Sequence, residues 1–205
     1  MRLLAASSIL DSHQQRVETI LTLFLSSQFL ATCAFILDVS AFFLASRPQT
    51  LRCLALSTLL MSVHFMLLSQ LSAAVLMLIA SSRYLIATRI QHKSIMWIFI
   101  VLSIISSIFT WQRLENLLPL CGSLLHTYAA FRRHDLTLRL FTATGSLCWL
   151  INNLLCHSPV AAAMEAFFIM STLVSYIRIN KHSQDPLVKP EPLLCVASKI
   201  KRPSR

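Results

Sequence analysis

Three charged side chains, Asp38, Arg83 and Glu165, lie inside long apolar stretches of this sequence, and the imidazole of His64 lies in another. An ionisable group at membrane depth costs about 2.5 to 3.5 kcal/mol or more, so such groups normally face a protein interior or an aqueous cavity. Together they offer both signs of charge and an imidazole that can donate or accept hydrogen bonds. The sequence therefore predicts polar recognition chemistry within an apolar surround.

A first polar group is expected near one end of the apolar stretches. His64, Asn152, Asn153 and Glu165 lie within about four to seven residues of that end, roughly 6 to 10 Å deep at 1.5 Å per helical residue, and Gln28 extends the group. These five residues are our candidates for a solute path, with Glu165 as the charged member. The alternative is structural: asparagines in lipid contribute on the order of 1 kcal/mol as contacts between helices, and Glu165 is equally open to such a role.

A second polar group is expected toward the opposite end. Asp38 and Arg83 both lie about seven residues from it, roughly 10 Å deep, and we predict that they form a buried ion pair. The pair is either a gate or a structural lock, and the lock is favoured because pairing relieves the burial cost of both charges. His126, Tyr128 and Tyr84 are interpreted as packing residues near the same end.

Other kinds of chemistry lack a pattern here. We find no H-E-x-x-H, no G-x-S-x-G and no Gly-rich phosphate loop, and the six cysteines show no C-x-x-C spacing. The net charge of +10 comes from basic residues at the ends of apolar stretches and in the C-terminal tail, not from a stripe with interleaved aromatics. We therefore expect no enzyme, no catalytic residue, no metal, no cofactor and no nucleic-acid partner.

The elements that must position the polar residues are membrane helices. With 56% hydrophobic and 13% charged residues, the chain is too apolar for an ordinary soluble domain. Apolar runs near the roughly 20 residues that cross a bilayer alternate with short breaks rich in Arg, Lys, Pro and His. We predict an all-α polytopic membrane protein with seven transmembrane helices, at residues 19–45, 51–69, 72–90, 94–110, 115–131, 137–156 and 159–179.

A weak internal repeat organises these helices. At an offset of about 88 residues, Leu71-Ser72-Ala73-Ala74 falls on Pro159-Val160-Ala161-Ala162, and His64 falls on Asn152. The repeat predicts two parallel three-helix bundles, 19–90 and 114–180, joined by a linker helix within 91–113. Residues 1–18 are expected to be a short extramembrane segment, and 181–205 a basic, disordered cytoplasmic tail that rests on anionic lipid.

The basic residues also predict an orientation. The first, third and fifth loops and the start of the tail carry most of them, whereas the second and sixth loops carry no Lys or Arg. By the positive-inside rule the C-terminus is cytoplasmic and the N-terminus periplasmic. Arg113, Arg2 and Arg16 are contrary to this rule.

Several fragments resemble, in order, the YgjV family of bacterial inner-membrane proteins. They are residues 63–68, Arg83, 88–89, 117–119, 148–153, 164–165, 177–178 and 185–186. The resemblance implies a multi-pass inner-membrane protein with a helix arrangement similar to that of the SWEET and PQ-loop transporters. His64, Arg83, Asn153 and Glu165 match the family pattern, but a Pro-Gln dipeptide of the PQ-loop kind at a helix kink is missing.

This resemblance, together with the repeat and the polar groups, favours a small-solute permease with a polar path between the bundles. The alternative is a non-transporting scaffold or assembly factor whose polar residues only fasten helices. The sequence leaves the substrate, the coupling ion and homo-oligomerisation open.

Overall fold

The computed structural model describes residues 2–41, 43–44, 46–90, 92–131 and 135–183. This part of the chain holds seven α-helices, one 3-10 helix and no strand, so the prediction of an all-α chain with seven long helices is confirmed. The helices are α1 Arg2–Ala41, α2 Arg47–Leu67, α3 Leu71–Ala87, α4 Lys93–Phe109, α5 Leu117–Ala130, α6 Asp135–Leu155 and α7 Pro159–Ser183, with the 3-10 helix η1 Leu114–Asn116 before α5.

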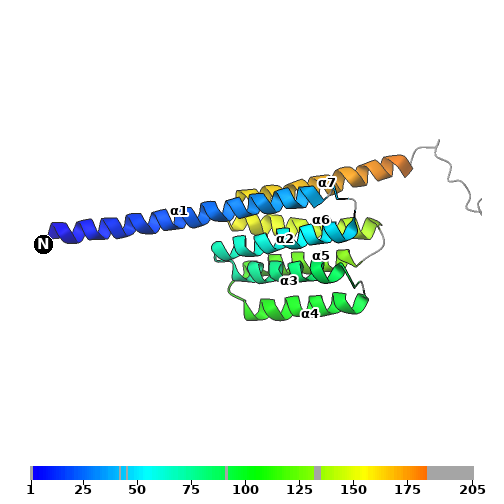
Figure 1. Cartoon of the computed structure of the whole chain (residues 1–205), viewed down its shortest axis with the longest axis horizontal. Coiled ribbons are helices and arrows are strands. Elements are labelled where there is room, and N and C mark those ends of the chain that lie inside the picture. Colours follow the sequence, from blue (N-terminus) through cyan, green and yellow to red (C-terminus); the bar gives the residue numbers. More distant parts are fainter. Residues whose placement is uncertain (1, 42, 45, 91, 132–134, 184–205) are drawn as a thin grey trace, which may run out of the picture.

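The first helix begins much earlier than expected. It starts at Arg2 and runs for 40 residues, about 60 Å, so residues 2–18 of the predicted segment 1–18 are helical and continuous with the first apolar stretch. The physical reason is that neither Pro nor Gly occurs before Pro48, so nothing interrupts the helical backbone. That this segment lies outside the membrane stays a prediction. From His13 to Leu23 every side chain is exposed, and the N-terminal half of α1 projects well beyond the other helices (Figure 1).

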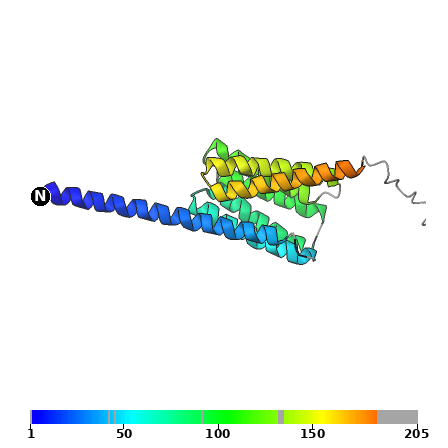
Figure 2. The ribbon, with the colours of Figure 1, turned by 90° about the horizontal axis from the view of Figure 1, so that it is seen from above.

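Six helices form two groups. In one group α2 packs between α1 and α3, and in the other α6 packs between α5 and α7. The groups touch where α1 meets α7 and where α3 meets α5 (Figures 1 and 2). The helix α4 packs mainly against α3 and α5 and lies on the outside of the bundle (Figure 1). Under the 88-residue offset α1 corresponds to α5 and α3 to α7, so the two contacts between the groups are equivalent to each other.

The turns after α2 and α6 repeat atom for atom at the same offset. Ser69 and His157 both have positive φ, 58° and 51°, a conformation that favours glycine. In the first turn Gln70 N donates to Phe65 O at 2.9 Å, and in the second Ser158 N donates to Asn153 O at 2.9 Å. Both are Schellman motifs, which close the last turn of a helix and allow an immediate reversal into the next.

Two glycines let α5 and α6 approach closely. A Cβ atom on Gly122 would lie 2.6 Å from the Trp149 ring, and one on Gly145 would lie 2.3 Å from the ring of His126. Each glycine also lies near the carbonyl oxygen of the other, because ideal Cβ atoms would be 3.1 and 3.2 Å from those oxygens. The two glycines, the only ones in the sequence, thus leave room between α5 and α6 for the indole of Trp149 and the imidazole of His126.

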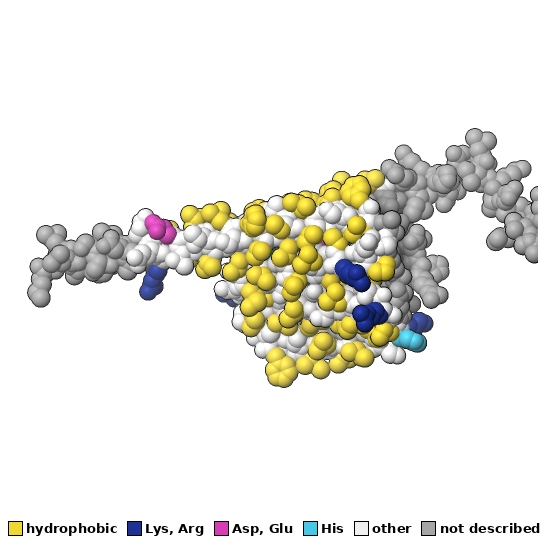
Figure 3. Space-filling view, in the orientation of Figure 1, with side chains coloured by type: hydrophobic (Ala, Val, Ile, Leu, Met, Phe, Trp, Pro, Cys, Tyr) yellow, Lys and Arg dark blue, Asp and Glu magenta, His cyan; other side chains and the backbone are white. Residues whose placement is uncertain are grey.

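The outer faces of the helices are apolar. On α4 the exposed side chains include Trp97, Ile98, Val101, Leu102, Ile105 and Ile108. Figure 3 shows apolar side chains spread over one face of the bundle, with Lys and Arg near the end where α4 begins. Exposed apolar surface of this extent is typical of proteins that meet lipid or a partner.

Two helical segments of the described chain, His13–Ala41 and Pro48–Leu67, have both the length and the hydropathy of a membrane span, with mean hydropathies of 2.0 and 1.5. Four further apolar segments are shorter: Leu71–Ala87, Lys93–Phe109, Leu140–Leu155 and Pro159–Val174. Only 17% and 33% of the two long segments are buried, so most of their apolar side chains face outward rather than into a protein core.

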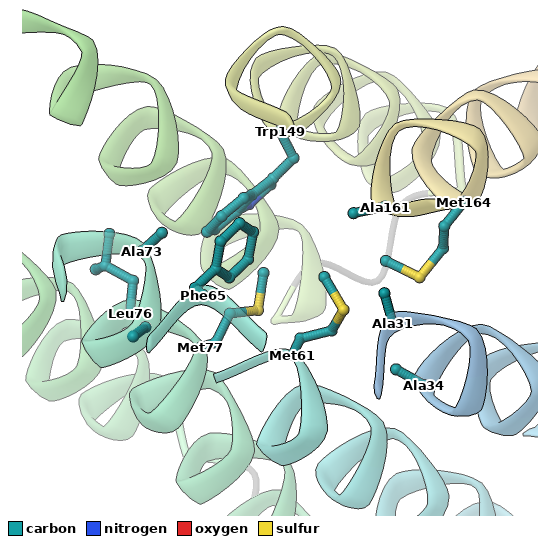
Figure 4. Packing of buried hydrophobic residues seen from close by; sticks show 11 residues of the cluster. Ala31, Ala34, Met61, Phe65, Ala73, Leu76, Met77, Trp149, Ala161 and Met164 are labelled. Atoms are coloured by element: carbon teal, nitrogen blue, oxygen red, sulfur yellow. The ribbon is translucent and has the colours of Figure 1, made fainter. Parts of the chain in front are cut away.

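A compact apolar layer joins the two groups of helices. Phe65 and Trp149 come from α2 and α6, and their rings pack together with centroids 5.6 Å apart and planes tilted by 35°. Around them lie Met61, Met77 and Met164 from α2, α3 and α7 (Figure 4). We refer to these five residues as the apolar layer.

Candidate functional site

A cavity of about 560 Å³ lies between the two groups of helices. Every helix except α4 contributes to its wall. The lining reaches Ala130, the last residue of α5, and Tyr84, three residues before the end of α3, so the cavity extends to the ends of these helices. At its other extreme it meets Met61, Met77, Trp149 and Met164, four residues of the apolar layer.

The wall follows the 88-residue repeat closely. Ten lining residues belong to α1, α2 and α3, and nine of them have a counterpart 88 residues later that also lines the cavity. The nine pairs are Asp38 and His126, Leu54 and Thr142, Thr58 and Ser146, Met61 and Trp149, Leu76 and Met164, Met77 and Glu165, Ala80 and Phe168, Arg83 and Ser171, and Tyr84 and Thr172. The cavity is therefore built by equivalent faces of two repeats, although the side chains of most pairs differ.

Three buried charged side chains, Asp38, Arg83 and Glu165, line this cavity, together with His126. The structure thus brings Glu165 together with Asp38 and Arg83, whereas the sequence placed Glu165 with His64, Asn152 and Asn153. The two carboxyl groups and one guanidinium give the wall one more acidic than basic charged group. In a water-poor site such charges act strongly on a bound solute.

The Arg83 guanidinium is only partly satisfied. Its terminal nitrogen donates a hydrogen bond to Thr127 Oγ1, and its Cζ lies 5.0 Å from the centroid of the Tyr84 ring, within the range of a cation–π contact. Its Nε atom, however, is buried and has no hydrogen-bond partner among the described residues. The side chain as a whole is only 4% exposed.

No ion pair joins Asp38 and Arg83, two residues that the structure describes. The predicted pair is replaced by the contact of Arg83 with Thr127, a residue of α5 in the other group of helices. Asp38 lines the same cavity from α1, so the two opposite charges share a space without neutralising each other at close range. A gate or lock made of these two side chains alone is thus not what this conformation shows.

Glu165 carries the second buried atom that lacks a partner. The residue is 4% exposed, and its Oε2 atom makes no hydrogen bond within the described part of the chain. Buried carboxyl oxygens are normally paired, because an unpaired one loses hydration without compensation. The depth of Glu165 in the sequence predicts a polar site, and the structure shows that the residue lines the cavity.

His126 was interpreted as a packing residue, but it belongs to the same wall. Its Nε2 lies 3.2 Å from the carbonyl oxygen of Thr142, which can only accept, so Nε2 donates there, and Ser146 Oγ is 3.5 Å away. One signal in the sequence could have identified it: His126 is the counterpart of Asp38 at the 88-residue offset.

His64 and Gln28 lie outside the cavity and fasten three helices together. His64 Nδ1 donates to the carbonyl oxygen of Ser27 at 2.8 Å, and its Nε2 is 3.1 Å from Ser158 Oγ, just before α7. Gln28 also reaches Ser158 Oγ at 3.5 Å and accepts from Val160 N at 3.4 Å. This network connects α1, α2 and the start of α7 on the far side of the apolar layer.

Replacing His64 is expected to change stability more than recognition. His64→Ala removes two buried hydrogen bonds and leaves a cavity, which should lower the free energy of unfolding by about 2 to 4 kcal/mol. His64→Gln keeps one polar group and should recover part of this loss. Thermal unfolding of the purified variants in detergent measures the effect; a His64→Ala protein as stable as the wild type would contradict a fastening role.

Asn152 and Asn153 are also outside the cavity wall. Both are buried, and within the described residues Asn152 Nδ2 and both polar atoms of the Asn153 amide have no hydrogen-bond partner. Asn153 lies one helical turn beyond Trp149 in α6, on the same face of the helix. Unpaired polar groups therefore exist on both sides of the apolar layer.

Of the tail predicted for 181–205, residues 184–205 lie outside the described residues.

A family model described as "Imp-YgjV: Bacterial inner membrane protein" matches residues 25–183 of this chain. Inner membrane protein YgjV of Escherichia coli strain K12 is 26% identical over 169 residues, which cover 81% of this chain and 92% of that protein. No solved structure matches the chain. These findings confirm the YgjV part of the resemblance seen in the sequence; they contain no SWEET or PQ-loop protein.

Proposed function

This chain belongs to the YgjV family of bacterial inner membrane proteins, and we propose that it is a small-solute transporter of that membrane. The observation that carries the proposal is the cavity between the two groups of helices. It has the volume of a small-metabolite site, about 560 Å³, and buried charged groups in its wall. Polar groups at membrane depth are costly, and they typically mark solute or ion pathways.

The proposal includes a two-repeat architecture. The groups α1–α3 and α5–α7 form equivalent halves around the cavity, and α4, which contacts α3 and α5 from outside, links them in a 3+1+3 arrangement. A parallel repeat of this kind requires an odd connecting span, because the second half must enter the membrane from the same side as the first. The matched turns and the matched cavity lining support it.

All seven helices cross the membrane in this proposal. The four shorter apolar segments, of 16 or 17 residues, extend about 25 Å, near the thickness of a thin hydrocarbon core. The shortest α-helix, α5, has 14 residues and follows directly on η1. The exposed cations Arg52, Arg89 and Lys93 lie at the end toward which the cavity extends. By the positive-inside rule this end is cytoplasmic, and the cavity opens inward. The apolar layer then separates the cavity from the periplasmic side.

A cysteine placed in the cavity tests the path. We expect that a bulky, membrane-impermeant thiol reagent blocks uptake by Thr172→Cys, because Thr172 lines the cavity from α7. Uptake is measured by mass spectrometry of solutes captured by proteoliposomes from a metabolite mixture. Modification should be fast in inside-out vesicles and slow in right-side-out vesicles if the cavity opens to the cytoplasm.

Leu173→Cys is the matched control, since the neighbouring side chain is exposed on the outer face of α7. The five described cysteines are absent from the cavity lining, so treated wild-type protein is a second control. No solute captured above empty liposomes, or full uptake after complete modification of Thr172→Cys, would favour the scaffold alternative. Faster modification in right-side-out vesicles would reverse the proposed orientation.

A further inference from the structure

Two residues of the cavity wall, Glu165 and Arg83, each carry a buried polar atom without a partner, and the two atoms are of opposite character. Glu165 Oε2 can accept a hydrogen bond and Arg83 Nε can donate one, and neither has a partner among the residues that the structure describes. Both residues are 96% buried and line the same cavity. An unpaired buried group of this kind costs about 1 to 3 kcal/mol, more when charged, so two in one cavity indicate a missing ligand.

The two groups do not satisfy each other. No ion pair joins Glu165 to Arg83, both of them described residues, and the guanidinium is held in place by Thr127 and Tyr84. Met77, the counterpart of Glu165 in the first repeat, lies six residues before Arg83 on α3, which is about 9 Å along the helix axis. If equivalent positions of the two repeats lie at the same level, Glu165 and Arg83 are offset along the helix axes by about this length, which suits a small molecule with one hydrogen bond of about 3 Å at each end.

We propose that the cavity binds a small zwitterion, an α-amino acid or a close analogue, with its ammonium on Glu165 and its carboxylate on Arg83. This inference rests on the proposed transport function. Arg83 presents Nε–H beside its terminal nitrogens, a geometry suited to a carboxylate. A carboxylate oxygen without a partner is in turn a natural acceptor for an ammonium group.

The rest of the wall fits an apolar side chain on that zwitterion. Met61, Met77, Trp149 and Met164 close one end of the cavity, and Phe168 lies along α7 one turn beyond Glu165. Methionine side chains adapt to apolar groups of different shape. We therefore expect aliphatic and aromatic amino acids to bind better than Asp, Glu, Lys or Arg, whose additional charge would enter this apolar end.

The test compares each zwitterion with the two molecules made by removing one of its charges. Thermal unfolding of the unmodified protein in detergent is measured with the twenty common α-amino acids and, for leucine and phenylalanine, with isoamylamine, isocaproate, phenethylamine and 3-phenylpropionate. A ligand at about 100 times its Kd should raise Tm by on the order of 5 °C. At least one apolar amino acid should do so, and its amine and acid counterparts should bind at least about tenfold more weakly.

Two variants assign the ends of the ligand. Arg83→Gln should weaken binding of the zwitterion at least about tenfold and change the affinity for its amine counterpart much less. Glu165→Gln should also weaken binding of the zwitterion at least about tenfold, but it should change the affinity for the acid counterpart much less. Arg52→Gln and Glu115→Gln, at exposed positions, are the matched controls. Size-exclusion profiles identify any variant that fails to fold. In that case the comparison of the zwitterion with its amine and acid counterparts on the unmodified protein decides whether the zwitterion assignment holds.

The outcomes separate this inference from the transport proposal. Binding of the amine or the acid counterpart as tight as that of the zwitterion, or no Tm rise with any amino acid, overturns the zwitterion assignment. If proteoliposomes still accumulate a sugar or another non-zwitterionic solute, transport stands and only the solute class is wrong. If an apolar amino acid binds through Arg83 and Glu165 but is not accumulated, the site stands and the transport function fails.

Discussion

Glu165→Gln is expected to abolish most solute uptake without destabilising the protein. Losing a charge-assisted contact to a buried ligand typically costs about 2 to 5 kcal/mol, which corresponds to roughly 30-fold to more than 1000-fold in affinity. Stability should be unchanged or higher, because Glu165 Oε2 has no hydrogen-bond partner to lose within the described chain, and the amide oxygen of glutamine can still accept from Ser146, the side chain that interacts with this carboxyl. Glutamine keeps the shape while removing the burial cost of a charge. Proteoliposome uptake and Tm are measured on the same preparations.

The control for this prediction is Glu115→Gln, which makes the same chemical change at an exposed residue of η1. It should leave both uptake and Tm near the wild-type values. The scaffold alternative expects a different pattern for Glu165→Gln, a clear fall in Tm and no uptake by either the wild type or the variant. A Glu165→Gln protein that unfolds several degrees earlier, yet accumulates solute normally, would assign the carboxylate to structure.

The helices and their pairing in the fold are largely readable from the sequence. Short breaks at Ser46 to Gln49 and around Ser158 predict adjacent helices, and the structure places α1 beside α2 and α6 beside α7. The 88-residue offset predicts equivalent turns after α2 and α6, and both are Schellman motifs. These features are local: they depend on neighbouring residues and on the backbone alone.

The grouping of the polar residues is not readable in the same way. His64 and Glu165 have similar depths along their helices, but one lies in a hydrogen-bond network and the other in the cavity wall. In a soluble helix an apolar stripe identifies the buried face, whereas lipid makes the outer face apolar as well. Depth can therefore be inferred from the distance to a helix end, but orientation around the axis cannot.

The repeat could have supplied part of the missing information. Applied to ionisable residues, the offset pairs Asp38 with His126, and both line the cavity. It also pairs Glu165 with Met77 and Arg83 with Ser171, which places each of these charges in one half only. The lining positions of the two halves are thus nearly equivalent, but the side chains at these positions differ. Such a wall is suited to a solute with two different ends.

The length of α1 shows another limit of sequence patterns. Residues 1–18 are predicted to form a segment apart from the first apolar stretch, but polar residues do not end a helix unless Pro, Gly or a capping geometry interrupts it. Residues 13–23 of α1, whose side chains are exposed, make no part of the cavity wall. Its helical state therefore changes the fold without changing the proposed site.

Trp149→Ala is expected to have the largest effect on both stability and sealing. Trp149 is the largest of the fully buried side chains that the structure describes; it packs on Phe65 and covers Gly122. Removing the indole should lower the free energy of unfolding by about 3 to 5 kcal/mol. It would also join the cavity to the region of Asn153, which lies one turn beyond Trp149. Unfolding in detergent and release of trapped radiolabelled sucrose from proteoliposomes measure the two effects.

Two further variants make the sealing argument specific. Trp149→Phe keeps an aromatic ring beside Phe65 and should retain sucrose, although with lower stability than the wild type. Trp97→Ala removes the same side chain from the exposed face of α4, where Trp97 is 60% exposed, and should affect neither measurement strongly. A loss of stability need not cause a leak, because sucrose escapes only if a route is open on both sides of the apolar layer. A folded Trp149→Ala protein that retains sucrose as well as Trp97→Ala would show that the apolar layer alone does not close the path, and that the network of His64, Ser158 and Gln28 beyond it forms a second barrier.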